Sequence, residues 1–189
     1  MKKKVCGVDE VGRGALAGPL VVASVIFKSY DNIPCNIKDS KQVNFEKRKK
    51  LFKSILKRSH VGISCIDAKT IDKEGITKST EIAIKSSIDN NKYQKDIILI
   101  DGNYNINTNY ETLNIVKGDS NYVSIAAASI VAKVIRDYIM ILEANQFPQY
   151  LWHKNKGYGT KDHLRAIQIY GITDFHRKSF KISLINLKL

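Results

Sequence analysis

The sequence predicts an α/β domain in which helices cover both faces of a mixed central sheet. Strand-like runs come first, separated by a short glycine-containing loop, and this order favours antiparallel pairing. Further along the chain, strand and helix patterns alternate, which is typical of α/β domains. The 189 residues, of which 43% are hydrophobic, contain no repeat and no Gly/Ser linker, so one domain is expected over residues 1–189.

The first two strands are expected on either side of a glycine loop. Residues 4–9 form a short apolar run. Residues 18–27 (GPLVVASVIF) form a longer run that is apolar at nearly every position, as expected for a strand covered on both faces. Between them, residues 11–15 (VGRGA) bend the chain. A third strand is expected at residues 61–66.

Helices are expected before and after this third strand. Asn44 is a suitable N-cap for a basic, amphipathic helix that ends near Arg58. The remaining expected elements are helices at 68–74 and 78–90, strands at 97–100 and 113–116, an alanine-rich helix from Ser120 to about Ala144, and a helix at 161–170. The alanines make the long helix thin, so it can lie close to the sheet.

Charge and cysteine content limit the possible functions. Lys and Arg number 31 against 18 Asp and Glu, and the formal charge of +13 favours a polyanionic partner. Cys6, Cys35 and Cys65 form no CxxC pair, and the four histidines form no HxxxH pair. A zinc site or a disulfide framework is therefore not expected, and the composition favours a reduced, cytoplasmic protein.

Neither a leader peptide nor a membrane segment is expected. Three lysines follow Met1, but Asp9, Glu10 and Arg13 interrupt the uncharged stretch that a signal peptide needs. No run approaches the roughly 18 apolar residues required to cross a bilayer.

Four carboxylates stand where apolar strands end or helices begin: Asp9 and Glu10, Asp101, and Asp119. Such acids can converge at one end of a sheet. Mg²⁺ and Mn²⁺ take oxygen ligands, and two ions about 4 Å apart can activate water and stabilise the leaving oxygen during phosphodiester cleavage. An acidic cluster in a basic protein therefore indicates metal-dependent chemistry on nucleic acid.

Each acid also has a plain structural explanation. Asp101 and Gly102 could form a hairpin turn, Asp119 could cap a helix, and Asp9 and Glu10 could be solvated at a strand end. Because neighbouring strand residues face opposite sides, Asp9 and Glu10 can share a site only if the backbone leaves strand geometry between them. The glycines that follow make such a departure plausible.

The segment from Gly12 to Gly18 resembles a dinucleotide fingerprint only superficially. Its third glycine, Gly18, comes one position late, and Pro19 opens a strand rather than continuing a helix. As a loop beside the acids, Gly12 and Gly14 would let the backbone approach a sugar-phosphate, and Arg13 could neutralise a phosphate. A plain tight turn would need the glycines but not the arginine.

Six segments closely resemble, in order, the motifs of bacterial ribonuclease HII: GVDEVGRGALAGPLVVASVIF, DSKQ, LIDGN, VKGDSNYVSIAAASIVAKVIRDYIM, NKGYGTKDH and HRKSF. They span residues 7–180. The resemblance implies a ribonuclease H-like fold with a C-terminal helical extension that contacts the substrate, here residues 147–189. It also implies an enzyme that hydrolyses the phosphodiester on the 5′ side of ribonucleotides in duplex DNA and RNA in RNA/DNA hybrids, leaving 3′-hydroxyl and 5′-phosphate ends. A monomer is expected. The cellular role implied is removal of misincorporated ribonucleotides.

The resemblance assigns the metal site to Asp9, Glu10, Asp101 and Asp119, which match the family's four acids that hold Mg²⁺ or Mn²⁺, with two metals expected. The sister ribonuclease HIII usually has glutamate at the position of Asp119 and an extra N-terminal domain. A replication clamp is a possible partner, although the terminal residues 185–189 are too generic to identify a clamp-binding peptide.

The resemblance also implies the substrate contacts. Gly12, Arg13 and Gly14 match the loop that contacts the ribonucleotide 2′-hydroxyl, which is the group that marks RNA within DNA. Ser40 and Lys41 match a phosphate contact. Tyr158 matches the tyrosine that packs against the nucleotide after the ribose and helps to select an RNA–DNA junction.

Other residues are expected to lie outside the chemistry. Arg136 and Asp137 are expected to form a structural pair, and His153, His163 and His176 to have structural or backbone-contact roles. Ala15 departs from the family, in which proline is common after the second glycine, and this loosens the loop.

Two other functions stay open at this point. A nuclease of the same fold, such as a junction resolvase, would use similar acids but ignore the 2′-hydroxyl. A non-catalytic hybrid-binding module would bind with a steep salt dependence and cleave nothing.

Overall fold

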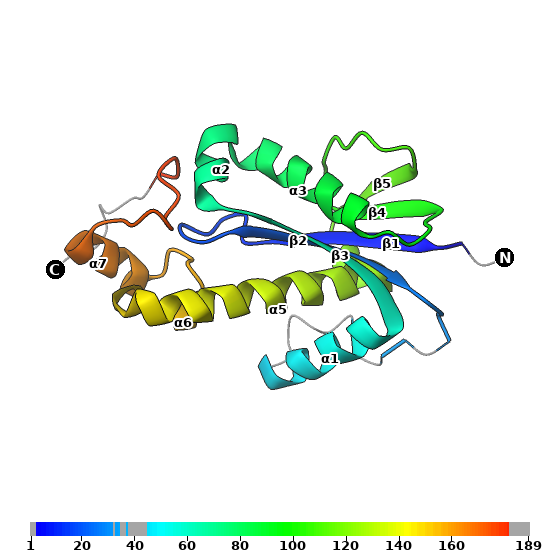
Figure 1. The fold of residues 1–189 in the computed structure, drawn as a ribbon, viewed down its shortest axis with the longest axis horizontal. Helices are drawn as coiled ribbons and strands as arrows, with labels where there is room; N and C mark the ends of the chain where they lie inside the picture. Colours follow the sequence, from blue (N-terminus) through cyan, green and yellow to red (C-terminus); the bar gives the residue numbers. More distant parts are fainter. Residues whose placement is uncertain (1–2, 32, 35–36, 38–44, 182–189) are drawn as a thin grey trace.

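The computed structural model describes residues 3–31, 33–34, 37 and 45–181 and consists of three layers (Figure 1). A five-stranded sheet with the order β3-β2-β1-β4-β5 forms the middle layer. The strands are β1 (Val5–Val11), β2 (Leu20–Phe27), β3 (Ser59–Ile66), β4 (Ile97–Asp101) and β5 (Glu111–Ile115). Strands β1, β2 and β3 pair antiparallel, whereas β4 and β5 run parallel to β1. The mixed sheet predicted from the sequence is confirmed.

Helices cover both faces of the sheet, as predicted (Figure 1). On one face lie α1 (Phe45–Arg58) and α5 (Val123–Gln146), and on the other lie α2 (Ala68–Glu74) and α3 (Ile76–Asn90). Every residue of β2 is buried, because alternate side chains enter the two apolar cores.

Helix α5 lies directly on β1. A Cβ built on Gly7 would be only 2.1 Å from the carbonyl carbon of Ser124, so a larger residue could not occupy this crossing. Small residues on the helix, Ala126 to Ala128, are buried against the same face. The close approach predicted from the alanine-rich sequence is thus observed, and it brings the polar side chains of α5 near the strand ends.

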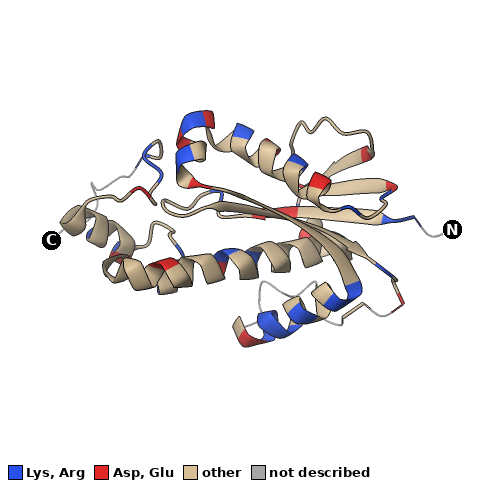
Figure 2. Ribbon diagram, in the orientation of Figure 1, with Lys and Arg blue, Asp and Glu red and all other residues tan. Residues whose placement is uncertain are grey.

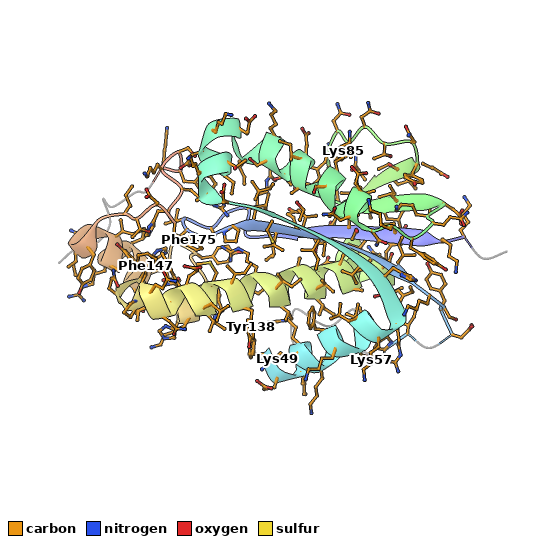
Figure 3. The ribbon with its side chains drawn as sticks, in the orientation of Figure 1. Lys49, Lys57, Lys85, Tyr138, Phe147 and Phe175 are labelled. Carbon is orange, nitrogen blue, oxygen red and sulfur yellow. The ribbon has the colours of Figure 1, made fainter. Side chains whose placement is uncertain are left out.

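The segment after α5 folds onto the loop that joins β1 and β2. It contains η1 (Pro148–Tyr150), α6 (Trp152–Asn155) and α7 (Lys161–Tyr170), of which only α7 was predicted. Its buried aromatic residues pack with Ala17 and Met140, and Phe147 and Phe175 lie beside them at this end of the molecule (Figure 3). The packing fixes this segment against residues 12–19.

Several predicted boundaries differ from the structure; β2, β3 and α3, for example, begin at Leu20, Ser59 and Ile76 rather than at residues 18, 61 and 78. Strand β1 continues beyond Asp9 to Val11 because residues up to Val11 remain paired with β2. Strand β5 begins earlier and ends at Ile115 rather than residue 116. The predicted long helix is divided at Tyr122, whose extended backbone separates a short helix, α4 (Gly118–Asn121), from α5. The predicted N-cap, Asn44, lies outside the described residues.

None of the helices in the described part of the chain combines the length and the apolar character needed to span a membrane.

Candidate active site

Asp9 and Asp101 are brought together by the register of two parallel strands. Val8 of β1 is aligned with Ile100 of β4, so the next residues along each strand, Asp9 and Asp101, are neighbours on the sheet. Both lie on the face covered by α5, where the Ser129 side chain is close enough to Asp9 to lower the pKa of its carboxyl group. Asp101 Oδ1 accepts a hydrogen bond of 3.0 Å from the Gly118 amide.

Glu10 points to the opposite face of the sheet. Its Oε1 accepts a hydrogen bond of 2.9 Å from the Tyr104 hydroxyl, and Tyr104 belongs to the core on the α3 side. The predicted departure from strand geometry between Asp9 and Glu10 is therefore wrong, because β1 stays paired through Val11. The two carboxylates lie on either side of the same sheet edge.

Asp119 lies one residue beyond the amide that binds Asp101. It is in the first turn of α4 and only 5% exposed, and the Ser120 hydroxyl lies 3.5 Å from its Oδ1. The hydrogen bond from Gly118 to Asp101 holds the start of α4 at the end of β4. The backbone of Asp119 therefore directly follows the amide that binds Asp101.

A cavity of about 390 Å³ opens over this sheet edge. Three of the four predicted acids, Asp9, Glu10 and Asp101, contribute to its wall. Arg48 from α1, Lys133 from α5 and Tyr158 also line it. The cavity thus combines carboxylates that can bind cations with basic groups that can bind phosphate.

Burial raises the pKa values of two of these acids. The pKa of Asp9 is raised from 3.8 to about 8, mainly because burial disfavours its charged form. The nearby charges of Glu10 and Asp101 raise this pKa further. The pKa of Glu10 is also raised by burial, against the hydrogen bond from Tyr104 that lowers it. Strongly perturbed carboxyl groups in a cavity are typical of functional sites.

The donor set fits a hard divalent cation, because the cavity wall offers carboxylate oxygens and a buried carboxyl group that a cation would stabilise in its charged form. The carboxylates do not converge on one point in this conformation. Among the residues that the structure describes, no group of three or more His, Cys, Asp or Glu side chains is placed so that it could hold a metal ion.

The glycine loop, residues 12–19, continues directly from β1. Gly12 is buried with φ of +91°, a conformation that favours glycine. Arg13 and Gly14 are exposed, and the Arg13 guanidinium lies 5.7 Å from the centre of the Tyr104 ring. The Ala15 amide donates to Gly12 O over 3.3 Å, a hydrogen bond that the proline common in the family could not make.

The tyrosine loop, residues 156–159, lies against the glycine loop. The amides of Leu16 and Ala17 both donate to Gly157 O, over 2.8 and 3.1 Å. Tyr158 is half-buried and lines the cavity. The structure therefore brings the predicted sensor of the ribose and the predicted stacking residue to one side of the acids.

Two histidines support the tyrosine loop from behind. His163 Nδ1 lies 3.0 Å from Tyr158 O, and its Nε2 accepts a hydrogen bond from the Trp152 indole and lies 3.3 Å from His176 Nε2. Both histidines are fully buried, and burial lowers both of their pKa values, that of His176 to about 4. The predicted structural and backbone-contact roles of these two residues are confirmed.

Two further predictions concern Ser40 and Lys41 and the pair of Arg136 and Asp137. Ser40 and Lys41 lie outside the described residues. The predicted pair of Arg136 and Asp137 is wrong: Asp137 binds Lys133 Nζ at 2.7 Å, and Arg136 instead donates to backbone carbonyls. Sequence spacing does not show which loop carbonyls lie near Arg136 in the fold. In the structure these carbonyls, rather than the Asp137 carboxylate, accept the hydrogen bonds of the guanidinium.

Sequence reasoning missed Arg48, Tyr104, Ser129 and Lys133. A signal existed for two of them, because Ser129 and Lys133 are four residues apart and therefore share one face of a helix. Arg48 and Tyr104 had no such signal, since only the folded chain brings them to the acids.

Comparison with known proteins gives the family. The sequence model described as Ribonuclease HII matches residues 6–183. The chain belongs to the ribonuclease HII family. Ribonuclease HII of Wolbachia sp. subsp. Brugia malayi (strain TRS) is 44% identical over 176 residues, which cover 93% of this chain and 87% of that protein.

Solved structures of ribonucleases H agree with the observed fold. The structure of the PCNA:RNase HII complex from Archaeoglobus fulgidus matches with a TM-score of 0.82 and 25% identity, covering 94% of this chain and 95% of that one. The Bst-RNase HIII complex with Mn²⁺ matches with a TM-score of 0.74 and 21% identity, covering 94% of this chain and 67% of that one. The predicted ribonuclease H-like fold is thus confirmed for this ribonuclease HII family member.

Proposed function

We propose that this ribonuclease HII family member cleaves the phosphodiester on the 5′ side of a ribonucleotide in duplex DNA and the RNA strand of RNA/DNA hybrids, leaving 3′-hydroxyl and 5′-phosphate ends. The observation that carries the proposal is the cavity at the end of β1 and β4, where paired acids face basic side chains beside the glycine loop. Removal of misincorporated ribonucleotides from DNA is the corresponding cellular role.

Asp9, Glu10, Asp101 and Asp119 would hold Mg²⁺ or Mn²⁺, with two ions as the expected number. When bound, the ions supply an activated water and stabilise the leaving oxygen. Binding would require the carboxylates to turn toward a common point, above all that of Glu10, which accepts a hydrogen bond from Tyr104 on the opposite face of the sheet. Asp9 would lose its proton as an ion binds.

The basic residues of the cavity would hold the substrate backbone. Lys133 is anchored by Asp137 at 2.7 Å, which orients its ammonium group at the cavity wall. Arg48 reaches the same wall from α1. Guanidinium and ammonium groups bind phosphate oxygens, so these two residues would position the duplex across the acids.

Selectivity would come from the two adjoining loops. Gly12, Arg13 and Gly14 would contact the ribose 2′-hydroxyl, and Tyr158 would pack against the following nucleotide. Ser40 and Lys41 would add a phosphate contact. The segment 147–189 would act as a substrate-contacting extension of one domain, because it carries Tyr158 and packs on the glycine loop.

A cleavage assay tests the proposal. The substrate is a labelled DNA duplex with one ribonucleotide, beside an all-DNA duplex and a branched DNA, each with Mg²⁺, Mn²⁺ or a chelator. We expect metal-dependent cutting just 5′ of the ribose and no cutting of the other two. Cleavage of branched DNA without a ribose would instead indicate a resolvase-like nuclease, and binding without any cleavage would indicate a hybrid-binding module.

An amide substitution tests the metal ligands. Asp101→Asn removes the charge while keeping the size of the side chain, so cleavage of the single-ribonucleotide duplex should fall by at least ~1000-fold. The exposed Asp89→Asn, on α3, is the matched control and should cleave normally. Normal cleavage by Asp101→Asn with metal binding intact would contradict the assignment.

Partner, assembly and location complete the proposal. The Archaeoglobus fulgidus ribonuclease HII is in a complex with PCNA. A replication clamp is accordingly a proposed partner here, with the chain acting as a monomer on DNA in the cytoplasm. Co-elution of the purified chain with its own organism's clamp on a sizing column tests the contact.

A further inference from the structure

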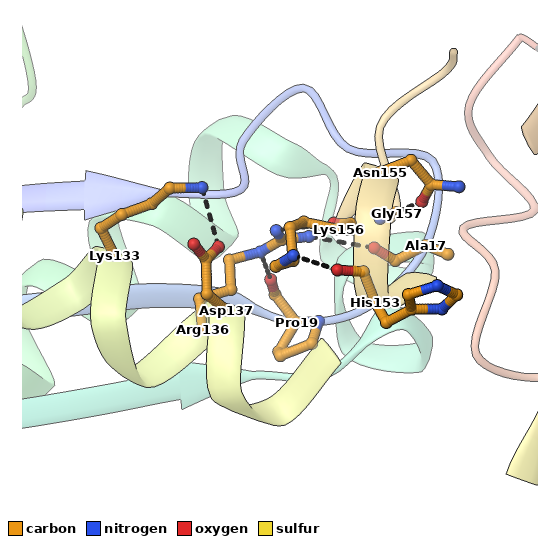
Figure 4. A network of polar contacts seen from close by, with 9 residues as sticks. All are labelled: Ala17, Pro19, Lys133, Arg136, Asp137, His153, Asn155, Lys156 and Gly157. Atoms are coloured by element: carbon orange, nitrogen blue, oxygen red, sulfur yellow. Dashed lines mark hydrogen bonds and ion pairs between the residues drawn. The ribbon is translucent and has the colours of Figure 1, made fainter. Parts of the chain in front are cut away.

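Arg136 forms the centre of a buried polar network behind the candidate active site (Figure 4). Its side chain is 0% exposed. The guanidinium donates three hydrogen bonds to backbone carbonyls: from Nε to Pro19 over 2.8 Å, from Nη1 to Lys156 over 2.8 Å and from Nη2 to Ala17 over 3.1 Å. Its hydrogen-bond donors are thus directed at the backbone of two separate loops.

Those loops are the two that would read the substrate. Pro19 and Ala17 belong to the glycine loop, and Lys156 belongs to the tyrosine loop. The Arg136 guanidinium carbon also lies 5.2 Å from the centre of the Tyr158 ring, within the range of a cation–π contact. The rigid guanidinium of Arg136 therefore contacts both Tyr158 and the glycine loop.

Gly12 completes the network from the substrate side. A Cβ built on Gly12 would lie 2.1 Å from Arg136 Nε. The guanidinium thus packs directly beneath the first glycine of the motif. Any side chain at this position would displace Arg136 from its carbonyl partners.

We propose that Arg136 is a positioning residue that fixes the glycine loop and Tyr158 relative to each other, so that ribose recognition and stacking on the next nucleotide occur together. This inference rests on the proposed function. A planar guanidinium with donors in fixed directions can reach three carbonyls at once, whereas a lysine ammonium cannot reproduce this fork. The consequence is a preference for RNA–DNA junctions over the interior of an RNA strand.

The test compares two substrates in Arg136→Lys. We expect kcat/KM for a single-ribonucleotide duplex to fall about tenfold more than kcat/KM for a long RNA/DNA hybrid, since buried charged hydrogen bonds are lost where the junction is read. In a Tyr158→Ala background, Arg136→Lys should add little further loss on the single-ribonucleotide duplex. Thermal unfolding of each variant shows whether it is folded.

Arg177→Lys is the matched control. Arg177 is also 0% exposed and donates to carbonyls of the glycine loop, at Arg13 over 2.9 Å and at Gly18 over 2.9 Å from Nη2 and 3.1 Å from Nε. No hydrogen bond links its side chain to the tyrosine loop in the described part of the chain. Arg177→Lys should lower activity on both substrates by similar factors, and its effect should multiply with that of Tyr158→Ala.

The outcomes separate the two proposals. If the wild-type chain does not cut the single-ribonucleotide duplex, the proposed function fails. If it cuts, but Arg136→Lys lowers both activities equally and multiplies with Tyr158→Ala, Arg136 is merely structural and the inference is overturned. If Arg136→Lys does not fold, Arg136→Gln decides, because its planar amide keeps a donor in the same place and should give the same substrate-selective loss.

Discussion

At the scale of single residues, Asp9 is a carboxyl group held where its charge is unfavourable. It is buried beside two other acids, and its pKa is raised from 3.8 to about 8. A folded-state pKa above the unfolded value means that the folded chain binds a proton that the unfolded chain does not. Between these two pH values, stability therefore falls as the pH rises.

This sign leads to a prediction for the metal-free protein. With chelator at pH 8, Asp9→Asn should raise the Tm by at least ~2 °C, the shift that about 1 kcal/mol produces in a chain of this size. Added Mg²⁺ should raise the Tm of the wild-type chain, because ligand binding stabilises the folded state. The same addition should raise the Tm of Asp9→Asn much less. Differential scanning fluorimetry at pH 6 and pH 8 measures both effects, and a lower Tm for Asp9→Asn would contradict the first.

Single residues also mark the limit of sequence-based prediction of the site. Asp9 and Asp101 end two apolar runs, and this pattern sufficed to group them. The direction of Glu10 was missed because it depends on whether pairing with β2 continues past Asp9, which no local pattern reports. Asp119 was correctly set at a helix start, yet the attachment of that helix to the end of β4 depends on the hydrogen bond from Gly118 to Asp101.

At the scale of elements, the crossing of β1 and α5 controls the position of the site. Gly7 has no room for a Cβ, so the strand and the helix meet backbone to backbone. The helix then carries Ser129 to Asp9 and Lys133 to the cavity. Most elements were predictable, since apolar runs and periodicity are local. The break at Tyr122 was not, because the residues there continue a helical pattern.

Enlarging Gly7 should separate the two elements. Gly7→Ala should destabilise the fold by about 3 kcal/mol, near the upper range for overpacking, and lower the Tm by roughly 6–12 °C. Gly14→Ala is the control, because a Cβ there would meet nothing within 4 Å. Chemical and thermal denaturation compare the two variants. Equal stability of Gly7→Ala and the wild-type chain would show that α5 can shift away from the sheet.

The two buried histidines behind the tyrosine loop, His163 and His176, should make the stability of the fold sensitive to acid. Burial lowers the pKa of His176 to about 4 and also lowers that of His163, so the unfolded chain binds protons first as the pH falls. Stability should therefore decrease from about pH 6.5 downward, where the unfolded histidine titrates. His176→Gln should flatten the decline in Tm between pH 7 and pH 5. An unchanged slope would mean that His176 does not respond to pH in this way.

At the scale of the whole molecule, positive charge is spread widely while the candidate acids lie together. Lysines and arginines are dense on α1 (Figure 2). That helix lies on the same face of the sheet as Asp9 and Asp101, and its Arg48 lines the cavity. Helix α3, which carries Lys85, covers the opposite face (Figure 3). A bound duplex should therefore follow the α1 side.

Salt dependence tests this orientation. The affinity of Asp101→Asn for a ribonucleotide-containing duplex should fall about 1000-fold between 50 and 200 mM salt if roughly six phosphates are contacted. Lys57→Gln, on α1, should reduce the slope of log K against log salt by about one, whereas Lys85→Gln should not change it. Fluorescence anisotropy at several salt concentrations gives these slopes. Equal effects of the two substitutions would show that the duplex does not follow α1.

The hydrogen bond from Arg177 to the Arg13 carbonyl joins residues 164 positions apart. The ribosome synthesises the chain from its N-terminus to its C-terminus. Asp9, Asp101 and Asp119 therefore all emerge well before Arg177. A nascent chain that has passed Asp119 already carries every candidate metal ligand, while its glycine loop still lacks this anchor and the tyrosine loop that packs against it. If the proposed assignments hold, the ability to tell ribose from deoxyribose is acquired after the metal ligands have been synthesised.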